Sequence, residues 1–170
     1  ATRLDRTTYA NCPGPLDPKL MVLHGLSLRT AAGGRYTVYA TNHGGRESIE
    51  VFEITAGGAA PTATWIGCVL MPNGMAANSV AAFGDRSLLA TVLILPGKTF
   101  EDAFAQRNAG AVFAWKPGDK TFQMLPGTAK LYGVTPEELD SVGPSADVAS
   151  RHFRDCMDRF AHDRIRGYLN

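Results

Sequence analysis

Short runs of apolar and β-branched residues, separated by Gly- and Pro-rich breaks, fill the chain from Leu20 to about Leu125. The run at 47–54 (ESIEVFEI) alternates, as the two faces of a β-strand do, and Glu47, Glu50 and Glu53 are predicted to form a solvated face of that strand. Strands of this length with turns at this frequency favour an antiparallel sandwich, barrel or propeller. The predicted strands cover 20–28, 36–41, 47–54, 62–70, 78–83, 87–95, 111–115 and 121–125.

Two segments inside this region carry other local signals. The segment Thr99–Arg107 (TFEDAFAQR) is predicted to form a short helix, because Thr99 can cap it and acidic residues occupy its first turn. The segment 115–122 (WKPGDKTF) is typical of a hairpin, since its Pro-Gly-Asp sequence favours a turn between two aromatic runs.

After Thr128 the pattern becomes helical. A capping box at Thr135 predicts one short helix, and Ser145 is predicted to begin a longer helix of about 24 residues, with apolar residues recurring every three to four positions. Such an amphipathic helix packs on its own sheet or on a second copy more readily than on a foreign partner. The sequence therefore predicts a β region over 1–128 and a helical tail over 129–170.

Composition narrows the class of protein. With 45% hydrophobic residues among 170, the chain can bury a core, and 17 Lys and Arg against 16 Asp and Glu leave a net charge of +1. This balance gives no drive toward nucleic acid, and no apolar run approaches the length of a membrane span. The three cysteines have no zinc-ligand spacing and make no disulfide scaffold, since an odd number leaves one thiol unless chains pair.

The sequence does not decide the cellular compartment. The first residues lack the basic and apolar segments of a signal peptide. We therefore expect either that any such segment has been removed already or that the sequence is truncated, so export is compatible with the sequence.

Three segments together carry a chemical signature: 22–29 (VLHGLSLR), 36–54 (YTVYATNHGGRESIEVFEI) and 71–85 (MPNGMAANSVAAFGD). In this order they resemble the paraoxonase/arylesterase-like branch of the gluconolactonase and senescence-marker-protein superfamily, over residues 20 to about 127. Proteins of that family are six-bladed β-propellers with calcium in the central tunnel. The resemblance implies a mainly β fold of partial, propeller-like antiparallel blades, followed here by the C-terminal helical appendage.

The resemblance also implies roles for individual residues. It makes His24 the general base, His43 its partner and Asn78 a calcium ligand, with Asn73 as the alternative ligand. Calcium takes about six to eight oxygen ligands and can polarise an ester or lactone carbonyl, while an imidazole can accept a proton near neutral pH. The implied function is calcium-dependent hydrolysis of lactones or aryl esters.

Two features keep a second interpretation open. A propeller blade takes about 40–45 residues, so the roughly 105 β-rich residues between Leu20 and Leu125 supply about two and a half blades. A homo-oligomer or a fragment of a larger propeller is therefore expected. A simple hairpin places His43 about 10 Å along the strand from the partner position of His24, so contact between them needs a bulge or bend. The alternative is a non-catalytic, propeller-derived β scaffold that serves assembly or binding, with both histidines structural and Asn73 a turn residue.

Overall fold

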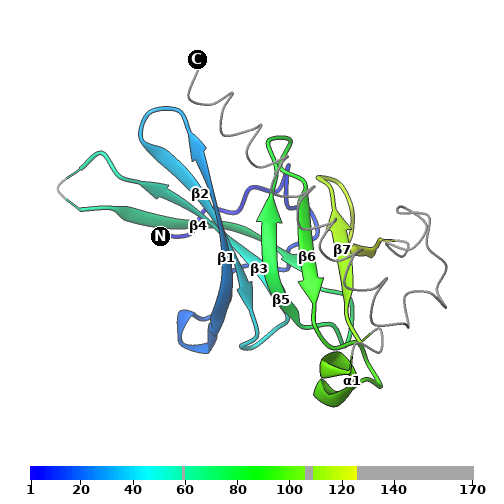
Figure 1. Ribbon diagram of the computed structural model, residues 1–170. Coiled ribbons are helices and arrows are strands. Elements are labelled where there is room, and N and C mark those ends of the chain that lie inside the picture. The colour runs from blue at the N-terminus through cyan, green and yellow to red at the C-terminus, as the bar shows by residue number, and fades with distance from the viewer. Residues whose placement is uncertain (59, 106–108, 126–170) are drawn as a thin grey trace.

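The computed structural model describes residues 1–58, 60–105 and 109–125, which fold into two antiparallel β-sheets (Figure 1). In the first sheet each strand pairs with the strand that follows it in the chain. Its strands are β1 (Leu23–Ala31), β2 (Arg35–Asn42), β3 (Ser48–Thr55) and β4 (Thr62–Leu70). A short 3-10 helix, η1 (Pro18–Leu20), precedes β1.

The second sheet repeats the same order of neighbours. Its strands are β5 (Ala77–Ala82), β6 (Leu88–Val92), β7 (Ala111–Trp115) and β8 (Gln123–Met124). The predicted hairpin is confirmed, because β7 pairs with β8 across the turn that follows Trp115. The predicted short helix is confirmed in its described part as α1 (Phe100–Phe104), capped by Thr99 through a capping box with Asp102.

The two sheets pack against each other through their first strands, since β1 and β2 both contact β5 (Figure 1). Side chains from both sheets form one buried cluster, in which Ile49 and Val51 of β3 join Leu88 of β6 and Phe113 of β7. Burial of these side chains stabilises the fold, at about 1.5–3 kcal/mol for each large apolar residue. This packing fixes the position of β1 relative to β5, where the candidate site lies.

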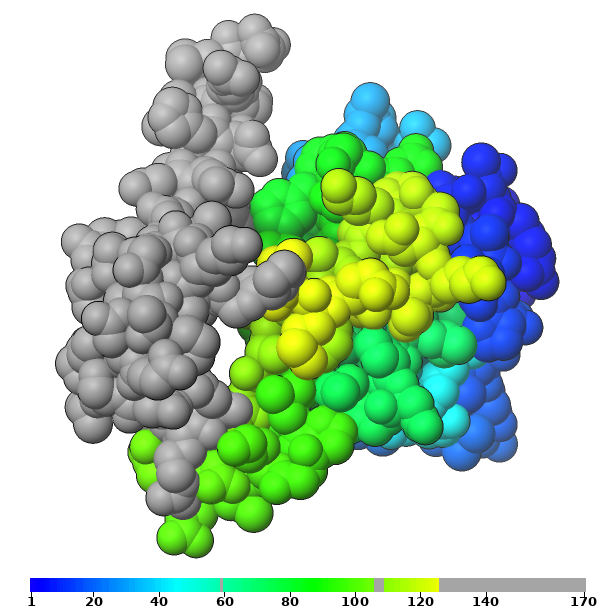
Figure 2. Space-filling model, turned by 90° about the vertical axis from the view of Figure 1, so that its right-hand side faces the viewer, coloured from blue at the N-terminus to red at the C-terminus, as the bar shows by residue number. Residues whose placement is uncertain are grey.

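The N-terminal residues extend the first sheet and then join it to the second. Thr2 forms a parallel bridge to Trp65 of β4. Tyr9 then stacks on Trp115 of the second sheet with ring centroids 5.9 Å apart, and Gly67 leaves room for its ring. Figure 2 shows these residues, in blue, beside the yellow-green residues of β7 and the turn after it, where the Asn11 side chain donates to a backbone carbonyl.

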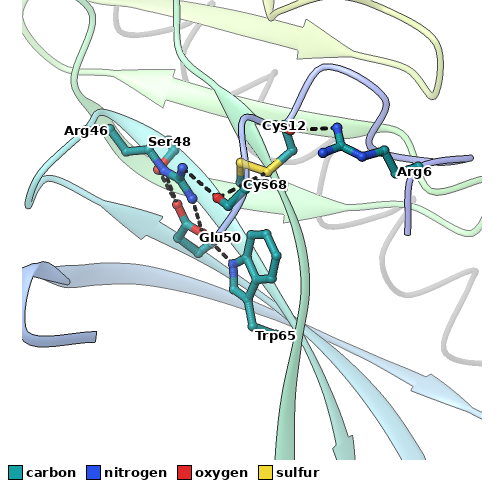
Figure 3. Close-up of a disulfide and its surroundings, with 8 residues drawn as sticks. Arg6, Cys12, Arg46, Ser48, Glu50, Trp65 and Cys68 are labelled. Atoms are coloured by element: carbon teal, nitrogen blue, oxygen red, sulfur yellow. Dashed lines mark hydrogen bonds and ion pairs between the residues drawn. A yellow bond between two sulfur atoms is a disulfide. The ribbon is translucent and has the colours of Figure 1, made fainter. Parts of the chain in front are cut away.

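A disulfide between Cys12 and Cys68 fastens this segment to β4 (Figure 3). The pairing accounts for two of the three cysteines, and Cys156 lies outside the described residues. The cysteine count left this pair open, because neither residue stands in a recognisable spacing.

The mainly β character predicted from the sequence is confirmed, as two four-stranded antiparallel sheets. The predicted helical tail, 129–170, lies outside the described residues. Within the described part of the chain, no helix is long and apolar enough to cross a membrane.

Candidate catalytic site

The two histidines singled out in the sequence lie next to each other. His24 is the second residue of β1, and His43 directly follows the last residue of β2. Their rings meet edge to face with centroids 5.6 Å apart. The contact needed a bulge or a bend, and β1 has such an irregularity: Leu23 pairs with Asn42, whereas Leu26 pairs with Ala40.

The bulge places His24 and Gly25 opposite a single residue of β2, Thr41. The buried hydroxyl of Thr41 accepts from the Gly25 backbone N–H at 2.6 Å and lies 3.3 Å from the Gly25 carbonyl, to which it donates. A side chain at position 25 would clash, because its Cβ would lie 2.7 Å from the backbone oxygen of Asn78 on β5. Strand pairing and the packing of the two sheets thus hold the bulge together.

The loop that carries His43 is fixed by a buried asparagine. The Asn42 amide oxygen accepts from the Val22 backbone N–H at 2.9 Å. Its amide nitrogen donates to the carbonyls of Gly44 and Arg46, at 2.9 and 2.8 Å. The His43 backbone N–H donates to the Val22 carbonyl at 3.1 Å, which ties the loop to the residue before β1.

Glu47 completes a short chain of polar side chains at this end of the sheet. The Nδ1 atom of His43 lies 2.9 Å from a carboxylate oxygen of Glu47, and the two side chains are 28% and 36% exposed. When His43 is neutral, Nδ1–H donates to Glu47 and Nε2 stays free to accept a proton. A carboxylate that orients an imidazole in this way is a recurrent arrangement in acid–base catalysis.

Glu50 anchors the same loop from inside the sheet (Figure 3). Its carboxylate is 0% exposed and accepts from the Arg46 guanidinium at 2.8 and 3.0 Å. The Ser48 hydroxyl and the Trp65 indole N–H also donate to it, at 2.7 and 2.6 Å.

The predicted solvated glutamate face is therefore wrong at Glu50. Four donors replace water around this carboxylate, so a charge that alternation places at the surface is held in the core. Glu53 is partly buried and pairs with Arg3 at 3.1 Å, and Glu47 faces His43. Of these three glutamates, only Glu47 belongs to the candidate site.

The two candidate metal ligands occupy different positions. Asn78 is exposed on β5 beside the bulge of β1, through the contact of its backbone with Gly25. Asn73 lies in the exposed turn before β5. No hydrogen bond within the described part of the chain joins either side chain to the two histidines.

The described residues do not by themselves supply a calcium donor set. Across 1–58, 60–105 and 109–125, no three His, Cys, Asp or Glu side chains gather as a metal site. Calcium needs about six to eight oxygen ligands, and Asn78 offers one amide oxygen. A calcium ion at Asn78 would therefore need oxygen ligands from outside the described residues.

The resemblance singles out the two histidines as candidates, but nothing in the sequence points to the groups that position them. Thr41 and Gly25 are ordinary strand residues until the bulge is known. Glu47 stands four residues after His43, but in a loop this spacing does not predict that the two side chains meet. A search of protein-family models finds no match to this chain, and a search of curated proteins finds none.

Proposed function

We propose that this chain hydrolyses lactones or aryl esters, with His24 as the general base and His43 as its partner. The observation that carries the proposal is the ring contact between His24 and His43, together with the 2.9 Å approach of Glu47 to His43. An exposed imidazole backed by a second imidazole and a carboxylate suits the removal of a proton from water.

The proposed step needs only these groups and water. His24 takes a proton from a water molecule whose oxygen attacks the ester carbonyl, and a new C–O bond forms. The tetrahedral intermediate collapses with cleavage of the bond to the leaving oxygen, which receives the proton back from the imidazolium. His43, held by Glu47, stabilises the positive charge on His24 during this cycle.

The first test is hydrolysis of phenyl acetate and of γ-butyrolactone by the full chain. His24→Gln should lower kcat/KM by about 100-fold, as expected for loss of a general base. Its urea unfolding midpoint should stay close to that of the wild type, because the side chain is exposed. Thr30→Ala, at an exposed position near the other end of the same strand, serves as the matched control and should keep full activity. Equal activity of His24→Gln and the wild type would remove the proposed base.

Calcium dependence, implied by the resemblance, is a separate part of the proposal. A ligand bound only by the folded state raises the melting temperature, so calcium should raise it and EDTA should reverse the shift. Asn78→Ala should reduce the shift more than Asn73→Ala. The reverse order would move the ligand to the turn, and no shift in the wild type at millimolar calcium would remove the metal.

A second candidate function, a non-catalytic scaffold for assembly, is favoured by the outer edge of β1. Leu26 and Leu28 are 65% and 62% exposed on this strand, which is an edge of the first sheet. Exposed apolar side chains on an edge strand favour association with another chain. We therefore propose a homo-oligomer that buries this edge. Light scattering should show a mass above that of one chain, and Leu26→Lys with Leu28→Lys should return it to a monomer; a wild-type monomer would contradict this proposal.

A further inference from the structure

A cleft of about 480 Å³ lies at the opposite end of the β1–β2 hairpin from the histidines. N-terminal residues, strands β1 to β4 and the turn between β5 and β6 bound it. Arg35, at the start of β2, contributes to its wall, whereas His43 follows the end of that strand. At about 3.3 Å per residue, Arg35 is about 26 Å and Tyr39, the lining residue of β2 nearest to His43, about 13 Å from His43 along the strand. The cleft is therefore separate from the candidate catalytic site.

Charged groups in the cleft leave one cation in excess. Three guanidinium groups and two carboxylates line it. Arg3 pairs with Glu53 at 3.1 Å, and Arg86 lies 3.9 Å from Asp5. Arg35 donates only to a backbone carbonyl, at 3.4 Å, and among the described residues no carboxylate lies within ion-pair distance of it. The cleft therefore carries a net positive charge with donors available to an anion.

The backbone at Arg86 is consistent with a role for its side chain. Its φ is 68°, the left-handed conformation that glycine or asparagine adopts more easily. The guanidinium donates to the Thr8 hydroxyl at 2.9 Å and is still 64% exposed. Residues in such backbone conformations persist where the surroundings hold them and often lie at binding sites. Arg86 thus reaches the cleft with N–H groups to spare.

The rest of the cleft wall mixes Leu4, Ala31 and the polar Thr37 with three large side chains of which only a small part is exposed. Tyr9, Tyr39 and Ile66 are all buried and line it. Burial, together with the neighbouring Tyr39 hydroxyl, raises the pKa of the Tyr9 phenol far above its ordinary value. The phenol therefore stays neutral. A ligand with a flat apolar body fits this wall, because pockets of this kind bind chiefly through apolar contact with a few polar anchors.

We propose that this cleft binds a small aromatic carboxylate, with its carboxylate on Arg35 and Arg86 and its ring toward Tyr39 and Ile66. One negative charge matches the single excess cation. A guanidinium is the side chain best suited to a carboxylate, because two of its N–H groups can donate in parallel. The inference stands independently of the proposed hydrolysis.

Titration of the isotope-labelled full chain with benzoate, followed by NMR, tests this site. Benzoate should saturate at millimolar concentration and shift the arginine Nε–H signal of Arg35 and the backbone signals near Tyr39. Arg35→Gln should weaken binding by about fivefold or more, as expected for a partly exposed ion pair. Lys98→Gln, an exposed cation outside the cleft, is the matched control and should change binding by less than about twofold.

A neutral ligand and a variant at the candidate catalytic site complete the titration. Benzamide has the shape of benzoate without its charge and should bind at least about fivefold more weakly. His24→Gln should leave benzoate binding unchanged. Equal binding of benzoate to wild type and Arg35→Gln, signal changes centred on His24 and His43, or no saturation at millimolar benzoate would each overturn the proposal.

Discussion

Replacing Glu50 with glutamine keeps the shape of a buried side chain and removes its charge. Glu50 is fully buried, and the side chain of its partner Arg46 is 15% exposed. Removing one partner of a buried pair costs about 3–5 kcal/mol, because the other charge is left uncompensated. The slight exposure of Arg46 and the two other donors to Glu50 place the expected loss at the low end, about 3 kcal/mol.

Urea unfolding at neutral pH measures this loss. With an m-value of about 2 kcal/mol per M, the midpoint should fall by about 1.5 M at unchanged m. Glu47→Gln is the matched control three residues earlier; its carboxylate is 36% exposed, and the loss should stay below about 1 kcal/mol. If Glu50→Gln lost no more than Glu47→Gln, the buried pair would not stabilise the loop that carries His43.

Three further predictions concern the fold around the site. Replacing Cys12 and Cys68 by serine removes a crosslink between residues 56 apart and should lower the free energy of unfolding by about 4 kcal/mol, through loop-closure entropy. The variant should therefore unfold at the same urea midpoint as the reduced wild type. Burial alone raises the pKa of Asp5, but hydrogen bonds from Thr8 and Thr7 and the nearby Arg86 outweigh burial and leave that pKa lowered. The stability that ionised Asp5 contributes is therefore present above about pH 4 and lost as the pH falls further. Asp5→Asn should reduce this loss of stability in acid. Gly25→Ala should cost about 1–3 kcal/mol by thermal unfolding and also lower the proposed esterase activity, because the new methyl group pushes the bulge away from β5. An unchanged melting temperature would refute the close approach.

The strands were predictable because their signals are local. Alternation in 47–54 and β-branched runs such as 62–70 specify strands whatever they pair with, and β4 has the predicted limits. The cap of α1 at Thr99 was likewise recognisable, since a capping box is formed within one turn of helix.

The site depended on contacts that no local pattern contains. Register in a regular hairpin separates His24 from His43, and the bulge that joins them is held by Thr41 and by the approach of β5. Alternation places Glu50 on a solvated face, whereas the partly buried guanidinium of Arg46 and the Trp65 indole hold it inside. Both features arise from pairing between segments and from the packing of the sheets, which become visible only in three dimensions.

The central claim is that His24 and His43 act as one unit in hydrolysis. A double-mutant cycle on phenyl acetate kcat/KM, with His24→Gln, His43→Gln and the combined variant, tests it most directly. Residues that serve one step are non-additive, so each single variant should lose about 100-fold and the double variant no more than the worse single one. Losses that multiply, or single variants that keep wild-type activity, would contradict the account.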